Sequence, residues 1–291
     1  MSSPVSKYVG PLETMPVSRH ARAISRGLRL WFGLMMVFLY VPIVFMIIFS
    51  FDESRTPGLP ITGFTLKWYE AMLGNRVLLG ALWNSLTVAA IVAVLATTIG
   101  TMAAFVLVRA GLRRPNAVRI AYTMPIMVPG VLIGVALLIF LSRVIHIQLS
   151  LVTVIAGHLV FTVPFVVLIV SARLQGFDSA LERAAADLGA SPRRAIRYVV
   201  LPLIAPAIMA GALISVTLSI DEFIITWFTI GSQATLPTYI YTQVKFGVTP
   251  EVNAVATVLL VGTLALLGVA ALILSRGRAL SSRLRRRRQA A

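Results

Sequence analysis

Six long stretches of the chain contain no Asp, Glu, Lys or Arg, and short charged segments separate them. The stretches cover residues 30–51, 77–108, 120–142, 144–172, 198–220 and 252–275. Each has at least 22 residues, and about 20 apolar residues span the hydrocarbon core of a bilayer as a helix. Helices are favoured because lipid offers no partners to unpaired backbone groups. The pattern therefore predicts an all-α membrane protein with six transmembrane helices.

Composition supports this prediction and excludes several kinds of site. Hydrophobic residues make up 58% of the 291 residues and charged residues 12%, whereas soluble domains are about half apolar and about a quarter charged. The chain has no Cys, which excludes disulfides, thiolate metal sites and Cys nucleophiles. It has only three His, so no metal site is predicted.

Basic residues are distributed unevenly between the apolar stretches. The N-terminus, loops 109–119 and 173–197, and the C-terminus hold 5, 4, 5 and 7 of the 26 Lys and Arg. Cytoplasmic loops of membrane proteins are enriched in Lys and Arg, so both termini are predicted to be cytoplasmic. The net charge of +16 and the run Arg285-Arg-Arg-Arg288 are interpreted as part of this asymmetry and not as a nucleic-acid site.

The same patterns divide the chain into three regions. Residues 1–27 lack hydrophobic periodicity and contain several Pro, which predicts a cytoplasmic N-terminal tail. Residues 28–276 are predicted to form the transmembrane domain, and residues 277–291 a basic cytoplasmic C-terminal tail. In the loop after the first stretch, Trp68 and Tyr69 favour a short interfacial helix over residues 64–73.

Loop 173–204 is much longer than a connection between two spans requires, and its first half predicts a short helix. Ser179 and Glu182 have the spacing of a capping box at a helix N-terminus. Gly189 suits the C-terminal cap. Between them, four residues at helical spacing predict a small apolar face: Leu181, Ala184, Ala185 and Leu188.

The second half of the loop predicts another short helix, which makes a hairpin. Ser191-Pro192 has the sequence of an N-cap followed by the first helical residue, and Leu201-Pro202 is predicted to end the helix. Such a hairpin fits two roles. It can lay a helix into a groove of a partner protein, or it can lie on the membrane surface.

Residues 181–202 resemble the EAA loop of ABC-importer permeases. That loop has the pattern E-A-A, three residues, G, nine residues, I, one residue, L-P, and the positions that match it are Ala184, Ala185, Gly189, Leu201 and Pro202. Arg183 stands where the family has Glu, with Glu182 just before it, and Val199 replaces Ile. The resemblance implies a cytoplasmic coupling hairpin in which Glu182, Arg183 and the matching residues contact an ATPase.

Other segments extend the resemblance over most of the chain. Asn84-Ser85-Leu86, Pro125-x3-Pro129-Gly130, His158-x5-Pro164-Phe165 and Ser219-Ile-Asp-Glu-Phe223 all resemble this superfamily. The stretch from Phe228 to Ala254 is similar to the second permease subunit of spermidine/putrescine importers. This resemblance implies a bacterial inner-membrane protein that forms half of a translocation path for polyamines.

The resemblance also implies partners. They are an ATP-binding subunit in two copies, a sister permease subunit, a soluble substrate-binding protein, a small cationic solute and membrane lipid, but no nucleic acid. The chain has no G-x-x-x-x-G-K-[ST] motif, so it is not expected to cradle ATP phosphates. No bound cofactor and no catalytic residue are predicted, with ATP and Mg on the partner ATPase.

Three other functions stay open at this point. An importer permease for another small polar solute would share these motifs. A membrane-embedded enzyme would require a nucleophile with a base, or a metal cluster, inside the bilayer. The ionisable candidates within or next to the apolar stretches are His146, His158, Asp221 and Glu222, and His158 suits a packed, hydrogen-bonded role. A secondary transporter would be expected to show repeats and a coupling-ion site.

Asp221 and Glu222 are carboxylates that the pattern places within a span. If that span starts near Leu203, Asp221 is 18 residues further on, or roughly 27 Å, and apolar residues continue beyond it. Carboxylates at such a depth are costly and normally face a cavity or a partner. Asp221, Glu222, Phe223 and Trp227 are therefore predicted to line the path of a cationic solute, which aromatic rings would also attract. The alternative is a structural pair bonded to helix ends or to Arg of another subunit.

Overall fold

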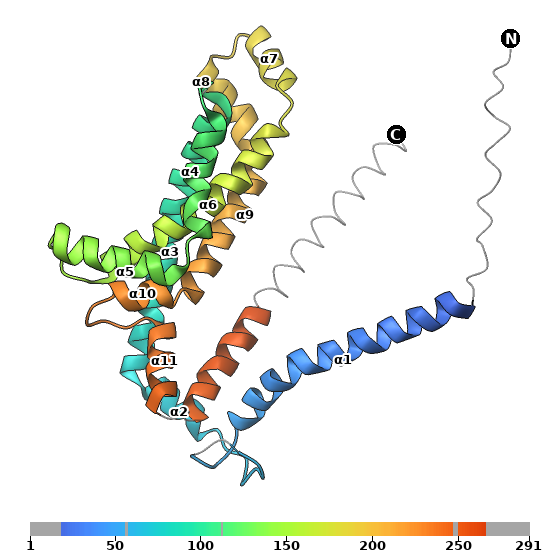
Figure 1. The fold of residues 1–291 in the computed structure, drawn as a ribbon, viewed down its shortest axis with the longest axis vertical. Helices are drawn as coiled ribbons and strands as arrows, with labels where there is room; N and C mark the ends of the chain where they lie inside the picture. Colours follow the sequence, from blue (N-terminus) through green and yellow to red (C-terminus); the bar gives the residue numbers. More distant parts are fainter. Residues whose placement is uncertain (1–18, 56–57, 112, 247–249, 266–291) are drawn as a thin grey trace, which may run out of the picture. The chain divides into compact units, whose positions relative to one another are not determined.

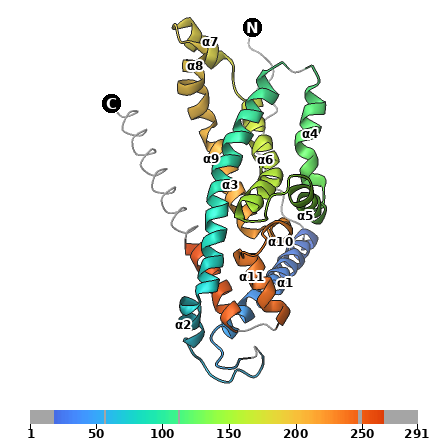
Figure 2. The ribbon, with the colours of Figure 1, turned by 90° about the vertical axis from the view of Figure 1, so that its left-hand side faces the viewer.

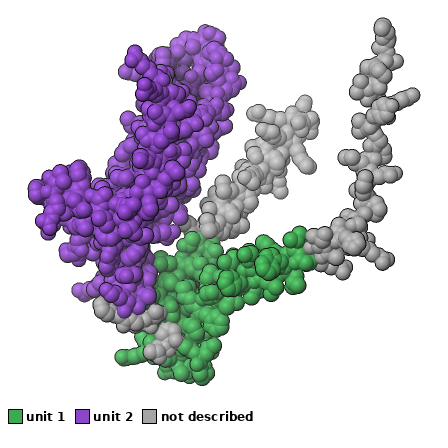
Figure 3. Space-filling view, viewed as in Figure 1, with its two compact units in different colours: residues 1–68, 250–291 green, residues 69–249 purple. Residues whose placement is uncertain are grey.

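The computed structural model describes residues 19–55, 58–111, 113–246 and 250–265. Contacts divide the chain into two compact units, residues 1–68 with 250–291 and residues 69–249, which are described separately (Figure 3). Within the described residues the regular elements are helices, and the only β pairing is an isolated bridge between Asp52 and Phe64. The predicted all-α class is confirmed.

The described residues contain four helices long and apolar enough to cross a membrane, or five if a bent pair counts as one span. In the first unit, α1 (Arg19–Phe49) begins within the predicted N-terminal tail, so residues 19–27 of that tail are helical. A shorter apolar helix, Pro250–Ala265, covers the first part of the predicted span 252–275. The rest of that span, residues 266–275, lies outside the described residues, and the count of six spans stays a prediction.

A buried carboxylate organises the loop that follows α1. Asp52 Oδ1 accepts hydrogen bonds from the N–H of Ser54 (3.2 Å) and from the N–H and hydroxyl of Thr62 (3.2 and 2.9 Å). The backbone N–H of Ser54 is the largest influence and lowers the pKa of Asp52, with burial acting in the opposite direction. The carbonyl of Asp52 accepts from the indole of Trp68 (2.7 Å), which ties the loop to α2 (Lys67–Gly74).

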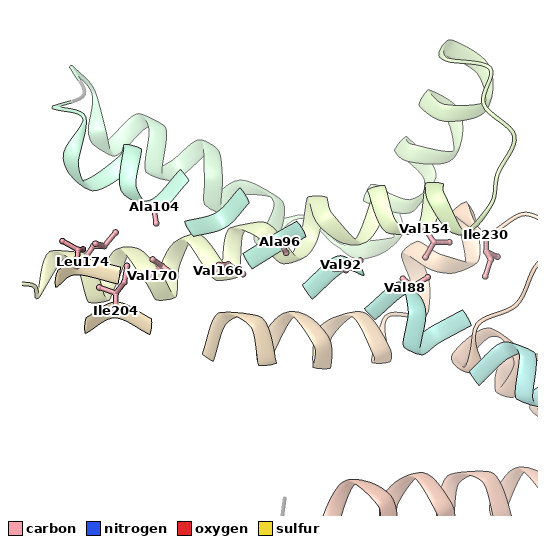
Figure 4. Close-up of a cluster of buried hydrophobic side chains, with 11 residues drawn as sticks. Val88, Val92, Ala96, Ala104, Val154, Val166, Val170, Leu174, Ile204 and Ile230 are labelled. Carbon is pink, nitrogen blue, oxygen red and sulfur yellow. The ribbon is translucent and has the colours of Figure 1, made fainter. Parts of the chain in front are cut away.

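Three helices form the core of the second unit: α3 (Arg76–Arg109), α6 (Leu151–Gln175) and α9 (Leu201–Asp221). They lie side by side (Figures 1 and 2). Small and β-branched side chains fill the seam (Figure 4), among them Val88, Val92, Ala96, Val166, Val170 and Ile204. Gly100 of α3 lies so close to Val166 that a Cβ there would be 2.6 Å from the Val166 Cβ. Small residues therefore set the close approach of these helices.

The predicted span 120–142 is not one continuous helix, because two helices occupy it. Helices α4 (Pro115–Met127) and α5 (Gly130–Ile139) meet at a bend of 96°. Val128 between them is extended, with φ −81° and ψ 128°. A residue before proline is driven out of the helical region by a clash with the proline ring, so Pro129 forces the break.

The helix of the next span begins later than the uncharged stretch 144–172 that predicted it. After α5 a π-helical turn (Phe140–Val144) ends in a loop, and His146 there has φ 57°. Helix α6 begins only at Leu151, where the Thr153 hydroxyl accepts from the Ser150 N–H (2.7 Å). The uncharged stretch is longer than the helix because the short loop before α6 also contains no charged residue.

Candidate functional site

Two groups of predicted site residues lie at opposite ends of the second unit (Figure 1). At one end are α7 (Ala180–Asp187) and α8 (Pro192–Ala195). At the other end are α10 (Ile224–Thr229) and α11 (Leu236–Phe246). We name the first group the hairpin end and the second the corner end.

At the hairpin end, an ion pair ties the hairpin to the core. Arg109 Nη2, at the end of α3, lies 2.6 Å from Glu182 Oε1 of α7, and both side chains are half-buried (28% and 27% exposed). The Arg109 guanidinium also lies over the rings of Phe105 and Phe177, at 5.4 and 5.7 Å. The two loops that were predicted to share one side of the membrane thus meet at this end.

The predicted capping box of Ser179 and Glu182 does not form. Asp178 Oδ1 accepts from the N–H of Ala180 (2.8 Å) at the start of α7. The hydroxyl of Ser179 accepts from Arg183 Nη1 (2.7 Å). Glu182 is engaged by Arg109, and a charged partner outweighs the backbone N–H that it would have capped.

Gly189 ends α7 as predicted. It has φ +83°, its N–H donates to Ala186 O (2.8 Å), and the N–H of Ala190 donates to Ala185 O (3.0 Å). This left-handed cap is one that glycine adopts without steric cost. No residue of α7 is buried, and Leu188 is 90% exposed. Ala184 is exposed and Ala185 half-buried, so the predicted apolar face is uncovered within the described structure.

The second helix of the hairpin does not end at Leu201-Pro202. It begins at Pro192 after Ser191 as predicted, passes through a π-helical turn at Ile196–Val200, and continues into α9. Proline lacks an N–H and its ring clashes with the carbonyl four residues before it. The wider π turn, in which the Leu201 N–H donates to Ile196 O, accommodates Pro202 without a break. Leu201 is half-buried and Pro202 exposed.

At the corner end, the structure separates the two predicted carboxylates. Helix α9 ends at Asp221, whose side chain is exposed. Glu222 is extended, with ψ 107°, and its Oε1 accepts from the N–H of Ile225 (2.9 Å), which caps α10. Bonding to a helix end was the structural alternative for the pair, and Glu222 has this arrangement.

Three aromatic rings form a cluster at the corner end. The ring of Phe223 lies 5.6 Å from that of Trp227 and 4.7 Å from that of Tyr241, and the rings of Trp227 and Tyr241 are 5.1 Å apart. Trp227 and Tyr241 are each 44% exposed. We call these three residues the aromatic cluster. It brings together two predicted site residues and one, Tyr241 of α11, that was not predicted to belong to the site.

Helix α10 packs closely against glycines of α5 and α6. A Cβ on Gly134 would be 2.7 Å from Phe228 Cδ2, and a Cβ on Gly157 would be 2.7 Å from Ile225 Cγ2. Gly130, one turn before Gly134, faces Ile224. Gly130 and Gly134 thus form a packing face for α10.

His158 of α6 lies at the corner end, where it contacts both α9 and α10. It is 1% exposed, and its ring nitrogens lie 2.8 Å from the hydroxyls of Ser219 and Thr226. The predicted packed, hydrogen-bonded role is confirmed. Among the described residues no three His, Asp or Glu side chains are grouped so that they could hold a metal ion.

A comparison with known families decides what this architecture is. Residues 96–286, about two-thirds of the chain, match the family described as "Binding-protein-dependent transport system inner membrane component". The chain belongs to this family. It is therefore a component of a transport system and a multi-pass protein of the inner membrane.

Individual relatives of this permease family share much of the chain. It is 41% identical over 237 residues to the spermidine/putrescine transport system permease protein PotC of Escherichia coli (strain K12), covering 81% of this chain and 89% of the relative. It is 36% identical over 230 residues to the putrescine transport system permease protein PotI of the same strain, covering 77% and 82%. The Haemophilus influenzae PotC is 39% identical, covering 81% and 91%.

Two solved structures show the same fold. A bacterial ABC transporter involved in the import of the acidic polysaccharide alginate has a chain that superposes with a TM-score of 0.69 at 15% identity, covering 87% of this chain and 97% of that one. The MetNI methionine ABC transporter superposes with a TM-score of 0.57 at 22% identity, covering 69% and 94%. The permease fold is thus shared although most side chains differ.

Several residues of the two ends were not predicted from the sequence: Arg109, Ser219, Thr226 and Tyr241. Each meets its partner through the fold, and Arg109 and Glu182 are 73 positions apart. No local spacing marks such pairs. Tyr241 does lie in the stretch similar to the polyamine permeases, and that similarity was the one signal pointing to it.

Proposed function

We propose that this permease is a subunit of an ATP-driven importer of polyamines, spermidine or putrescine, and forms half of the translocation path. The names of the relatives support a polyamine as solute. The observation that carries the proposal is the corner end, where an exposed carboxylate precedes the aromatic cluster.

The corner offers the two attractions that a chain of ammonium groups requires. Asp221 is the exposed carboxylate, and the partly exposed rings of Trp227 and Tyr241 attract cations through their ring quadrupoles. Glu222 has a different part, because its carboxylate already accepts the N–H of Ile225. In this proposal Asp221 and the aromatic cluster contact the solute, and Glu222 holds α10 in place.

The hairpin end serves energy coupling in this proposal. A separate ATP-binding subunit, in two copies, holds ATP and Mg, and its groove receives the exposed face of α7 with Glu182, Arg183, Ala184, Ala185 and Gly189. Leu201 and Pro202 are the first residues of α9, into which the hairpin continues. The Arg109–Glu182 ion pair passes the movement of the hairpin to α3.

The remaining parts of the importer follow the family. A sister permease supplies the other half of the path, a soluble binding protein delivers the solute, and lipid surrounds the transmembrane domain 28–276. The tails 1–27 and 277–291, and therefore both termini, lie in the cytoplasm. The chain itself binds no cofactor and catalyses no reaction.

The experiment compares two nearly isosteric variants at the corner. Asp221→Asn should lower spermidine or putrescine uptake by about tenfold or more, since an interaction with a charged group is lost, and the yield of the assembled complex should stay unchanged. Glu222→Gln should do less, because the amide oxygen can still accept from Ile225 N–H. Unchanged polyamine uptake in the double variant would remove this solute assignment.

A matched variant separates solute contact from folding. Glu222→Ala removes the cap of α10 and should lower complex yield and uptake together, since losing an N-cap costs about 1 kcal/mol. A fall in yield for Asp221→Asn as well would assign both carboxylates a structural role.

A further inference from the structure

His158 joins three helices at the base of the corner. Its Nδ1 lies 2.8 Å from Ser219 Oγ near the end of α9, and its Nε2 lies 2.8 Å from Thr226 Oγ1 of α10. All three side chains are buried, with 1%, 4% and 0% exposed. Both partners of the ring are uncharged hydroxyls. Nothing in the transport proposal above uses this histidine.

The hydrogen bonds of Thr226 determine which ring nitrogen carries the proton. A hydroxyl has one hydrogen to donate, and the hydroxyl of Thr226 donates it to the carbonyl of Glu222 (2.8 Å). Toward His158 the same oxygen can therefore only accept, and Nε2 must be the donor. A neutral imidazole then has its lone pair on Nδ1, which accepts from the hydroxyl of Ser219.

We infer that His158 is a neutral, Nε2-protonated positioning residue that fixes the corner between α9 and α10. The hydrogen bonds run in one direction, from Ser219 to His158, from His158 to Thr226, and from Thr226 to the carbonyl of Glu222. A neutral ring is consistent with its setting, because a buried charge without a charged partner is expensive inside a membrane.

We call this series of hydrogen bonds the relay. Its last acceptor, Glu222, connects it to the residues of the proposed solute site. Glu222 caps α10 through its side chain and receives Thr226 through its carbonyl. Its neighbours in the chain are Asp221 and Phe223. The relay therefore fixes the backbone that carries the exposed carboxylate and the first ring of the aromatic cluster. The protonation state of His158 is independent of the solute, whereas its effect on transport rests on the proposed function.

The first test reads the proton directly. The assembled complex, with this chain labelled with ¹⁵N-histidine, is reconstituted in lipid, and its ¹⁵N spectrum is compared with that of the His158→Gln variant, so that the difference belongs to His158. We expect one protonated Nε2 and one unprotonated Nδ1. A protonated Nδ1, or protons on both nitrogens, overturns the inference whatever the complex transports.

The second test measures transport together with assembly. Glutamine places an amide donor near the position of Nε2, whereas leucine provides no donor. His158→Gln should keep uptake within about threefold of the unchanged chain, and His158→Leu should lower it about tenfold, the effect of leaving buried hydroxyls unpaired. The loss should be in uptake per assembled complex. Equal uptake per complex for both variants overturns the positioning role.

A pair of variants in α10 tests the same relay if the leucine variant does not assemble. Thr226→Ser keeps the hydroxyl, and Thr226→Val keeps the shape but removes the link between His158 and Glu222. Serine should retain uptake, and valine should lower it about as far as His158→Leu. Equal uptake in the serine and valine variants contradicts the relay. If the unchanged complex takes up no polyamine, the solute assignment fails, and the ¹⁵N spectrum still decides the state of His158.

Discussion

Helices α7 and α10 are both short, and each follows a long helix of the core, α6 or α9. Three of the six residues of α10 are buried, and two glycines, His158 and Glu222 hold it. None of the eight residues of α7 is buried, and the ion pair of Glu182 with Arg109 is its tie to α3. The chain therefore fixes the position of α10 by itself and leaves α7 uncovered, as expected of a solute site at one end and a docking surface at the other.

The largest effect should come from adding bulk beneath α10. Gly157→Leu places a side chain where a Cβ alone would be 2.7 Å from Ile225 and 3.3 Å from Leu137. Overpacking of this kind costs about 3 kcal/mol, so we expect loss of assembled complex, measured as purified yield and melting temperature. Gly80→Leu is the matched control, because nothing lies within 4 Å of a Cβ at Gly80 of α3. Equal losses in the two variants would contradict the close packing of α10.

The second-largest effect should come from adding a side chain at the end of α7, where no other described residue is close. Gly189 has φ +83° and open space around it, so Gly189→Leu strains only the backbone, by about 1–2 kcal/mol. We expect normal amounts of protein in the membrane but loss of uptake and of solute-stimulated ATPase activity, because the end of α7 no longer fits its partner. Gly189→Asn should retain much of both activities, since Asn tolerates the left-handed conformation. Normal uptake and ATPase activity in the leucine variant would refute the docking role.

A smaller effect should follow from reversing the charge that ties α7 to α3. Glu182→Arg places two cations together at a half-buried position and should lower the uptake per ATP hydrolysed by a few-fold, since such pairs contribute about 1 kcal/mol. The double variant Arg109→Glu, Glu182→Arg restores opposite charges and should recover most of the ratio. If the double variant is worse than either single variant, the ion pair does not link the hairpin to the core.

The smallest effect is expected at Arg183, the position at which the EAA pattern described above has Glu. Its side chain is exposed and bonds only to Ser179 within the described residues. Surface changes of this kind are usually within about 0.5 kcal/mol, so Arg183→Ala should change uptake by less than about twofold. A loss as large as that of Gly189→Leu would show that the proposed contact of Arg183 with the ATPase is as important as the helix end, and would make α7 a more specific surface than the comparison with α10 indicates.

The sequence predicted elements well where one physical rule controls them. The uncharged run 77–108 matches α3 (Arg76–Arg109) to within one residue at each end, because a long lipid-facing helix excludes charges throughout. The cap at Gly189 is equally local, since only the backbone of one residue decides it.

Prediction failed where two rules compete or where the partner is distant. The break at Val128–Pro129 sits in an apolar run, and the apolar pattern outweighed the proline signal. Pro202 gave the opposite error, because a π turn can absorb a proline that ordinary helix geometry cannot. Asp221 and Glu222 differ in their surroundings because α9 ends between them. Two neighbouring acidic residues in a sequence do not indicate where a helix ends.

The π turn at Ile196–Val200 has one further consequence. By keeping the chain helical through Pro202, it makes Pro192–Asp221 one uninterrupted span of 30 residues, about 45 Å long. The second helix of the hairpin and the exposed carboxylate of Asp221 are then at the two ends of one helical span. If the hairpin end is held by a moving ATPase and the span pivots near one end, a tilt of about 10° displaces the other end by about 8 Å over that length. We expect such a span to act as a lever, whereas a proline that broke the helix would leave two pieces that could turn independently.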